Sequence, residues 1–189
     1  MAFQKGVDKW KLKRWFSVYA PAVFKDTIIG EIPGNDESSV LNRNMKVSLD
    51  VVTQNPQNTY TNLFFKITEV DGDKAKTKLV KMEILFSYVR SMVRKYRSIS
   101  TSVVDVKTKD NVNITIKPIA ITAKRETHSR LIGMRKEMNQ FIEAYSKENS
   151  ADAIIEAVIS GALQSEIQNK LKHIAQLNKV EIRKLEVNN

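Results

Sequence analysis

Residues 59–85, TYTNLFFKITEVDGDKAKTKLVKMEIL, hold two strand-like runs on either side of a turn. In the first run, Leu63, Phe65 and Ile67 occupy every second position, which is the pattern of a strand with one buried face. Asp71-Gly72 is a dipeptide typical of a tight turn, and the second run returns from it. The stretch therefore predicts an antiparallel β-hairpin.

More strands are predicted on both sides of this hairpin. Upstream, Pro21 makes residues 17–24 an edge strand or an irregular extended segment, while residues 45–53 alternate like a half-buried strand. Residues 30–34 and 35–39 have the glycine, proline and polar content of turns and loops. Downstream, the predicted strands are residues 102–108, 112–124 and 180–187.

Helical spacing appears first in residues 84–97, which predict a helix with two distinct faces. Its apolar stripe consists of Leu85, Val89, Met92 and Tyr96, and its basic face consists of Arg90, Arg94 and Arg97. A longer amphipathic helix is predicted for residues 127–145. Asn149-Ser150 can cap a further helix through Ile159, and a short helix is expected after Gly161.

The order of these elements is strands, one helix, more strands and then helices, without regular βαβ alternation, which indicates an α+β fold. We expect an antiparallel β-barrel core, with one basic helix inserted between strands and with carboxy-terminal helices, although the sequence pattern does not by itself reveal closure. We expect residues 1–16 to form a basic RNA-binding arm and residues 17–189 to form a single globular domain.

The 189-residue chain has no Cys and a formal net charge of +10. The missing thiols exclude disulfides, thiolate zinc sites, iron–sulfur ligation and cysteine catalysis, and they agree with a reducing compartment. No segment has the apolar run of a secretory signal or of a spanning helix, so a cytoplasmic protein is expected. The positive charge favours a polyanionic partner, namely DNA, RNA or an anionic membrane surface.

The basic residues are concentrated in three clusters, in residues 1–16, 90–97 and 117–136. One such cluster could be a solvated face, but three in one chain favour contact with nucleic acid. Residues 143–168 are acidic instead, and we expect them to face solvent or a basic neighbouring protein. The candidate RNA-binding residues are Lys9, Lys11, Lys13, Arg14, Trp15, Arg43, Arg90, Arg94, Lys95, Arg97, Lys124, Arg125, Arg130, Arg135 and Lys136.

Aromatic residues accompany two of these clusters. Trp10, Trp15 and Phe16 lie in the first cluster, and Tyr88 and Tyr96 lie beside the second. Such rings could stack on unpaired bases or could simply be core residues. The core interpretation is favoured for Tyr96, which lies on the apolar stripe, and Trp15 stays open. The first cluster could also form a membrane-binding amphipathic helix, but it is short and stands apart from the other two.

The sequence contains no recognisable catalytic, metal or cofactor pattern. Residues 30–34 are not followed by the Gly-Lys-Ser/Thr of a phosphate-binding loop, so a turn is the better interpretation. His128 and His173 lack the spacing and acidic companions of metal ligands, and we expect them at the surface or at helix ends. We expect no cofactor, no metal and no enzymatic activity. An RNA-processing site assembled from distant residues is the alternative that such patterns would not reveal.

Several segments, in order along the chain, carry a family resemblance. They are KRWFSVYAPAVF (13–24), IGEIP (29–33), VSL (47–49), LFFKITEV (63–70), YVRSMVRK (88–95), VDVKTKD (104–110), RK (135–136) and VEIRK (180–184). Together they resemble the archaeal form of the archaeal and eukaryotic small-ribosomal-subunit protein family called S-three-a-e, or eukaryotic-type S-one. The sequence departs from that pattern at Ile32 and Gly34, where Thr and Ala are expected, at Asn42, where Gly is usual, and at 176–178, which lacks a Pro and an Arg.

The resemblance implies a β-barrel with carboxy-terminal helices, bound at the platform of the small ribosomal subunit near the messenger exit. The implied partners are small-subunit ribosomal RNA and neighbouring platform proteins, without membrane binding or a homo-oligomer. The leading hypothesis is thus a structural constituent of the ribosome that binds folded RNA. A free-standing protein that binds single-stranded RNA or DNA is the alternative.

Overall fold

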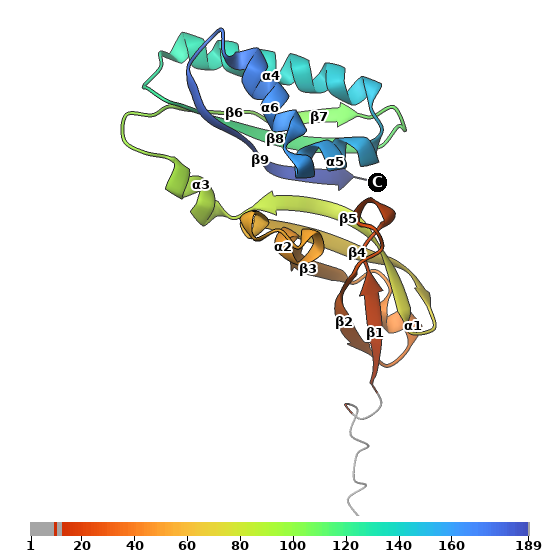
Figure 1. Ribbon diagram of the computed structural model, residues 1–189. Helices are drawn as coiled ribbons and strands as arrows, with labels where there is room; N and C mark the ends of the chain where they lie inside the picture. The colour runs from red at the N-terminus through yellow and green to blue at the C-terminus, as the bar shows by residue number, and fades with distance from the viewer. Residues whose placement is uncertain (1–9, 11–12, 189) are drawn as a thin grey trace, which may run out of the picture.

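The computed structural model describes residue 10 and residues 13–188 (Figure 1). In chain order, its elements are β1 (Arg14–Tyr19), η1 (Ala22–Phe24), β2 (Ile28–Gly34), α1 (Glu37–Val40), β3 (Asn44–Ser48), α2 (Leu49–Thr53), η2 (Pro56–Asn58), β4 (Thr61–Asp71), β5 (Lys74–Ile84), α3 (Phe86–Met92), β6 (Ile99–Thr101), β7 (Val104–Lys107), β8 (Asn113–Thr122), α4 (His128–Glu148), α5 (Ala151–Ser160), α6 (Ala162–Leu171) and β9 (Leu177–Asn188).

The predicted hairpin is confirmed as β4 and β5, which pair antiparallel along their whole length. Its inward residues Leu63, Phe65 and Ile67 are fully buried. Their registered partners on β5, Met82, Leu79 and Thr77, are also buried. Alternation identifies this hairpin because each inward side chain removes its apolar surface from water, while the intervening polar side chains remain hydrated.

The nine strands of the described residues form one open, mixed sheet, in the order β2-β1-β5-β9-β8-β6, with β3 on β4 and β7 on β8. The predicted antiparallel barrel is therefore wrong in two respects. β1 runs parallel to β5, and in residues 13–188 the strands β2 and β3 form no ladder that would close the sheet. The physical cause is a branch at β5, where residues 74–76 pair with β1 and residues 81–83 pair with β9.

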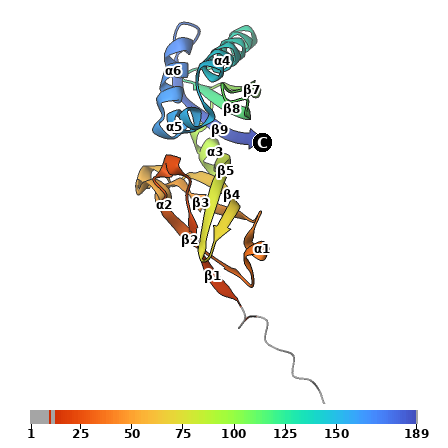
Figure 2. The same cartoon turned by 90° about the vertical axis from the view of Figure 1, so that its right-hand side faces the viewer.

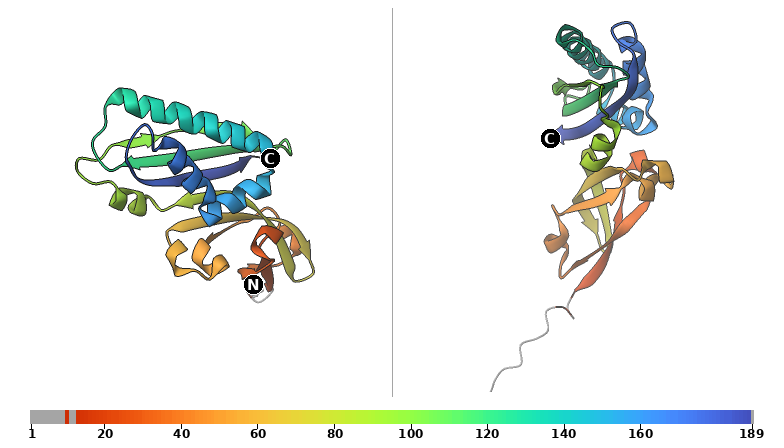
Figure 3. Two further views of the ribbon diagram at one scale, coloured as in Figure 1. Left: turned by 45° about the horizontal axis from the view of Figure 1, so that its top comes forward. Right: turned by 90° about the vertical axis from the view of Figure 1, so that its left-hand side faces the viewer.

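This branch divides the molecule into two lobes (Figures 1 and 2). The N-terminal lobe, residues 13–85, contains the curved strands β1–β5 with α1 and α2. The C-terminal lobe, residues 86–188, has α4, α5 and α6 on one face of β6–β9 (Figure 3). Helix α3 packs on the opposite face, where Val89 contacts a small cluster with Ile119 and Ile121. A single large apolar cluster nevertheless runs through both lobes, from Phe16 to Leu185.

Three predictions for the N-terminal lobe are corrected. β1 is paired on both sides and is not an edge strand, because it ends at Tyr19, before Pro21. Residues 30–34 belong to β2, and residues 37–40 form α1 rather than a loop. The predicted strand 45–53 changes after Ser48 into α2, in which Leu49 and Val52 are buried at helical spacing and Val51 is 51% exposed.

The helix predicted for residues 84–97 is also shorter than expected, because α3 ends at Met92. Beyond it the backbone of Val93 is extended and Tyr96 adopts a left-handed conformation with φ 66°, which breaks any helix. The chain turns here so that Ile99 can pair with Ile121. The long helix, the next two helices and the last strand are confirmed as α4, α5, α6 and β9. Ser150 caps α5 as predicted, accepting a hydrogen bond from the Ala153 N–H.

Candidate nucleic-acid interface

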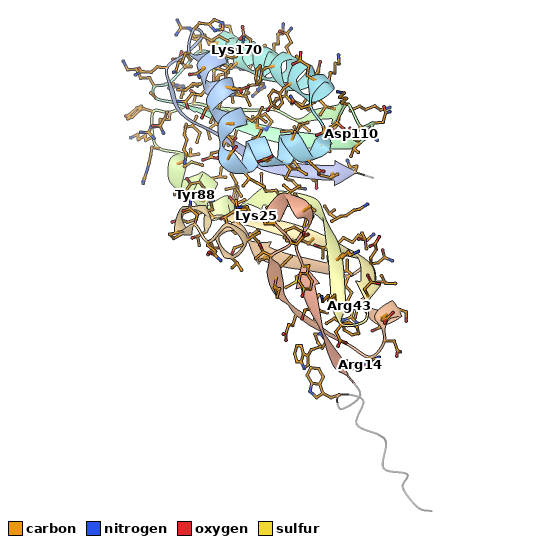
Figure 4. All side chains as sticks on the ribbon, turned by 45° about the vertical axis from the view of Figure 1, so that its right-hand side comes forward. Arg14, Lys25, Arg43, Tyr88, Asp110 and Lys170 are labelled. Atoms are coloured by element: carbon orange, nitrogen blue, oxygen red, sulfur yellow. The ribbon has the colours of Figure 1, made fainter. Side chains whose placement is uncertain are left out.

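The first candidate surface lies at the free end of the N-terminal lobe. Trp15 on β1 is directly opposite Pro33 on β2, and the Arg43 guanidinium donates a 3.0 Å hydrogen bond to the Pro33 carbonyl. Lys13 and Arg14 precede Trp15 and are exposed, and Trp15 is 57% exposed. Figure 4 labels Arg14 and Arg43 at this end of the lobe. We call Lys13, Arg14, Trp15 and Arg43 the tip surface; the candidates Lys9 and Lys11 lie outside the described residues.

Backbone geometry fixes Arg43 in the tip surface. The Ile67 N–H donates to the Arg43 carbonyl, and the Asn42 N–H donates to the Ile67 carbonyl, both at 3.0 Å. Asn42 has φ 62°, a left-handed conformation that Gly and Asn tolerate best. This is the position where the resemblance leads us to expect Gly, and Asn supports the left-handed backbone shape here.

A second candidate surface forms where the segment after α3 meets the segment before α4. The Ser98 N–H donates to the Thr122 hydroxyl at 2.9 Å, the Thr122 N–H donates to the Ser98 carbonyl at 3.0 Å, and the Glu126 N–H donates to the Ser98 hydroxyl at 3.0 Å. These bonds place two basic segments side by side at one end of the C-terminal lobe (Figure 1). We call Arg94, Lys95, Arg97, Lys124 and Arg125 the loop surface.

The loop surface is electrostatically uncompensated. Within the part of the chain that the structure describes, none of its five cationic groups lies within 4.0 Å of a carboxylate. Only the neighbouring Arg130 has such a partner, since its guanidinium is 2.8 Å from the carboxylate of Glu126. Glu126 thus neutralises Arg130 and leaves the five other cations available to an anionic ligand.

The remaining candidate residues lie on α3 and α4, near the loop surface but outside the segments that form it. Arg90 is exposed on α3, with its guanidinium 5.4 Å from the ring centre of Phe86. Arg135 and Lys136 are exposed further along α4. The predicted common helix face of Arg90, Arg94 and Arg97 does not exist, because the last two residues follow the end of α3. Tyr96 is 71% exposed, so its predicted core role is wrong.

Sequence reasoning missed Lys170 and Lys172, two exposed cations at the end of α6. Figure 4 labels Lys170. The Ala123 N–H donates to the Gln176 carbonyl at 2.8 Å, which holds the segment after α6 beside Lys124. His173 contacts Glu137 at 3.1 Å, and His128 begins α4; both are exposed, as predicted. The sequence Lys-Leu-Lys-His at 170–173 was the only available signal.

The acidic stretch lies at the opposite end of α4 from the loop surface. Helix α4 has 21 residues and is therefore about 30 Å long. All the acidic side chains of this stretch are exposed, namely Glu143, Glu148, Asp152, Glu156 and Glu166. Burial, together with the nearby Glu166 carboxylate, raises the pKa of Tyr145. The C-terminal lobe therefore has the loop surface at one end of α4 and the carboxylates of the acidic stretch, beside Lys107, Lys109 and Lys147, at the other.

A polar and aromatic contact connects the two lobes near α3. The rings of Tyr60 and Tyr88 stack with centres 4.4 Å apart, and the Lys179 ammonium donates a 2.6 Å hydrogen bond to the Tyr88 hydroxyl (Figure 4). Burial lowers the pKa of Lys179, but its hydrogen bonds to Glu181 and Tyr88 outweigh burial and raise that pKa overall. The contact holds α3, and hence the start of the loop surface, against β4 and β9.

The described residues contain no group of three or more His, Cys, Asp or Glu side chains that could hold a metal ion. In the same residues, every helix is too short or too polar to cross a bilayer. The arrangement offers instead two separated groups of cations on a rigid sheet. Such groups can neutralise phosphates at two places along a folded polyanion.

The fold and these surfaces define a basic, mixed α/β protein with two cationic surfaces at different ends. Similar curated proteins are archaeal and carry the name small ribosomal subunit protein eS1. The Sulfurisphaera tokodaii protein is 32% identical over 177 residues, covering 94% of this chain and 92% of its own. The Sulfolobus acidocaldarius protein is 35% identical over 178 residues, covering 94% and 90%, and a Saccharolobus islandicus protein is 34% identical over 180 residues, covering 95% and 86%.

The chain belongs to the Ribosomal S3Ae family, whose model matches residues 2–189. The resemblance drawn from the sequence segments is thereby confirmed. The family is one of structural ribosomal proteins and not of enzymes.

Proposed function

We propose that this protein is a structural constituent of the small ribosomal subunit, in the cytoplasm, that binds folded ribosomal RNA through the tip surface and the loop surface. Lysine and arginine contacts to phosphates supply the affinity, and the fixed shape of the two lobes supplies the placement. Its relatives of similar length are named as small-subunit proteins, which supports this assignment.

One observation carries the proposal, namely the hydrogen-bonded contact between Ser98 and Thr122. It joins cations from two separate parts of the sequence into one surface. Cations held on ordered backbone and left without carboxylate partners retain their full charge for an external anion. Like charges held together repel each other, and a bound polyanion would relieve that repulsion.

The resemblance further suggests a position at the platform, near the messenger exit and the 3′ end of the ribosomal RNA. The acidic end of the C-terminal lobe would then face solvent or a basic neighbouring platform protein, since phosphate would repel it. Residues 1–16 are proposed to act as a basic RNA-binding arm. Lys13, Arg14 and Trp15 belong to that stretch, and the last two also begin β1.

The test replaces Arg94, Arg97 and Arg125 with Gln in the full chain. Binding of the variant to small-subunit ribosomal RNA should weaken, and the slope of log affinity against log salt should become shallower by about 2 to 3. The matched control replaces Lys107, Lys109 and Lys147 with Gln. These three exposed cations lie near the other end of α4, where the Lys109 N–H donates to the Asn149 carbonyl.

The control variant should bind RNA like the unmodified protein. Both variants should largely keep its stability, because Arg97 is half-buried, the other replaced residues are exposed, and surface substitutions change stability by about 0.5 kcal/mol or less each. Equal losses in the two variants would refute a localised interface. Sedimentation distinguishes the proposed ribosomal constituent from the alternative, a free-standing protein that binds single-stranded RNA or DNA. A structural constituent stays with small subunits at one copy each after a high-salt wash, whereas a free-standing binder dissociates.

A further inference from the structure

The outward face of β3, β4 and β5 carries a group of lysines that neither basic surface includes. Lys46 on β3, Lys66 on β4 and Lys78 on β5 alternate with buried residues and therefore point away from the core. Lys46 and Lys78 are exposed, and Lys66 is half-buried. We call these three residues the lysine face.

Two of these lysines oppose each other directly. Lys66 on β4 is the registered partner of Lys78 on β5. Like charges at directly opposite positions of neighbouring strands destabilise a sheet. In the described residues, none of the three ammonium groups of the lysine face lies within 4.0 Å of a carboxylate. The free protein therefore carries an unrelieved repulsion at this point.

Elsewhere on the same outward face, lysines have carboxylate partners that compensate their charge. Where β5 meets β9, Lys81 is opposite Glu186 and Glu83 is opposite Lys184. Lys117 on β8 is opposite Lys184 on β9, but Glu186 contacts both lysines and compensates this like-charged pair. Toward the hairpin turn, Lys76 contacts Glu69 at 3.2 Å. The lysine face thus lies between two regions in which lysines have carboxylate partners.

The shape of the lysine face also suits an elongated anion. Phe64 lies between Lys46 and Lys81 in the register of β3, β4 and β5. The ammonium groups of these two lysines are 5.9 Å and 4.8 Å from its ring centre. The ring gives the lysine stems an apolar base and leaves their charged ends pointing outward. Lys46, Lys66 and Lys78 thus lie on the outward side of three neighbouring strands, beside this aromatic base.

We propose that the lysine face is a third RNA-binding surface, at which Lys46, Lys66 and Lys78 contact successive phosphates of one RNA strand. The bound phosphates would relieve the repulsion between Lys66 and Lys78. This inference rests on the proposed binding of ribosomal RNA and adds the sheet of the N-terminal lobe to the tip and loop surfaces.

Replacing Lys78 with Glu tests the inference, because stability and binding should change in opposite directions. Glu at position 78 would face Lys66 with the opposite charge, so the urea midpoint of the free protein should rise. The affinity for small-subunit ribosomal RNA should fall about fivefold or more, and its salt slope should become shallower by about 1. The matched control is Lys109→Glu, which makes the same charge change at an exposed turn and should leave RNA affinity nearly unchanged.

A higher urea midpoint with unchanged RNA affinity would overturn the inference and leave the proposed function intact, provided that the Arg94, Arg97 and Arg125 variant still loses affinity. An unchanged or lower midpoint would show that Lys66 and Lys78 do not repel each other and would remove the premise. Failure of the unmodified protein to bind the RNA would refute the proposed function together with the inference. The Lys78→Gln variant should lie between the unmodified protein and Lys78→Glu in both measurements.

Discussion

Both backbone polar groups of Ser98 are hydrogen-bonded to Thr122. The Ser98 N–H donates to the Thr122 hydroxyl at 2.9 Å, and the Ser98 carbonyl accepts from the Thr122 N–H at 3.0 Å. Thr122 is completely buried, and its hydroxyl is also 2.6 Å from the Lys124 carbonyl, to which it can donate its proton. One threonine at the end of β8 therefore holds both halves of the loop surface.

The Thr122→Val variant should lose stability and RNA affinity together. Valine keeps the shape of threonine but leaves the Ser98 N–H without its acceptor, which costs about 1 to 3 kcal/mol for a buried donor. Urea unfolding measures the loss, and amide exchange at Ser98 should become faster. Thr122→Ser, which keeps the hydroxyl, should preserve slow exchange. Fast exchange of Ser98 in the unmodified protein would show that this contact does not order the loop surface.

The Glu186→Gln variant should change how stability depends on pH. The hydrogen bond from Lys184 lowers the pKa of Glu186, and the charges of Lys184 and Lys117 lower it further, although burial opposes them. A lowered pKa stabilises the folded protein above the unfolded-state pKa of Glu, and this stabilisation disappears as pH falls through the lower folded value. The stability difference between unmodified protein and variant should therefore be largest near pH 7.

This difference should amount to about 1 kcal/mol or less, because the Glu186 side chain is 28% exposed. It should shrink toward zero as pH falls below about 4. Urea unfolding at a series of pH values measures it. Glu31→Gln is the control, since Glu31 is exposed on β2 and makes no ion pair in the described part of the chain. A difference that stays constant with pH would contradict the assigned role of Glu186.

The Gly34→Ala variant should be less stable, although the resemblance drawn from the sequence leads us to expect Ala there. A Cβ atom at Gly34 would overlap Cγ2 of Val40 and approach Cε2 of Phe16 to 3.1 Å. Overpacking of this kind costs about 1 to 3 kcal/mol. Adding Val40→Ala should remove the overlap, so the double variant should lose less stability than the two single losses combined. Additive losses in urea unfolding would exclude direct competition for this space.

Reversing Glu148, Asp152 and Glu156 to Lys should leave RNA affinity unchanged or raise it. These carboxylates are exposed at the acidic end of the C-terminal lobe, where phosphate would be repelled. Filter binding with small-subunit ribosomal RNA measures the effect, and circular dichroism checks the fold. A large loss of affinity in a folded variant would place this end of the molecule against RNA and reverse its proposed orientation.

Local patterns predicted the elements whose burial is regular. The long helix was identifiable because Met134, Met138 and Ile142 recur at helical spacing and are buried in α4. The change from β3 to α2 was not identifiable, because Leu49 and Val51 continue the alternation of the strand although only Leu49 is buried. A short apolar run permits both structures until its packing is known.

Features that depend on distant pairing could not be predicted. The sheet stays open because residues 81–83 pair with β9, near the end of the chain, and no local pattern encodes that choice. The basic clusters were recognisable from composition, but their assembly into the loop surface depends on Ser98 and Thr122, which are 24 residues apart. The lysine face could not be predicted from the sequence, because its three lysines lie on three different strands and form no cluster along the chain.

The junction between β5 and β9 consists of three registered pairs, Lys81 with Glu186, Met82 with Leu185 and Glu83 with Lys184. Because the two lobes share this continuous β-structure, the separation between the tip surface and the loop surface is set by hydrogen-bond register and not by a flexible linker. The molecule would then hold its two RNA-binding surfaces at one fixed distance. An RNA whose two binding elements stand at the wrong spacing could engage only one surface at a time and would forfeit the gain in avidity that simultaneous binding provides.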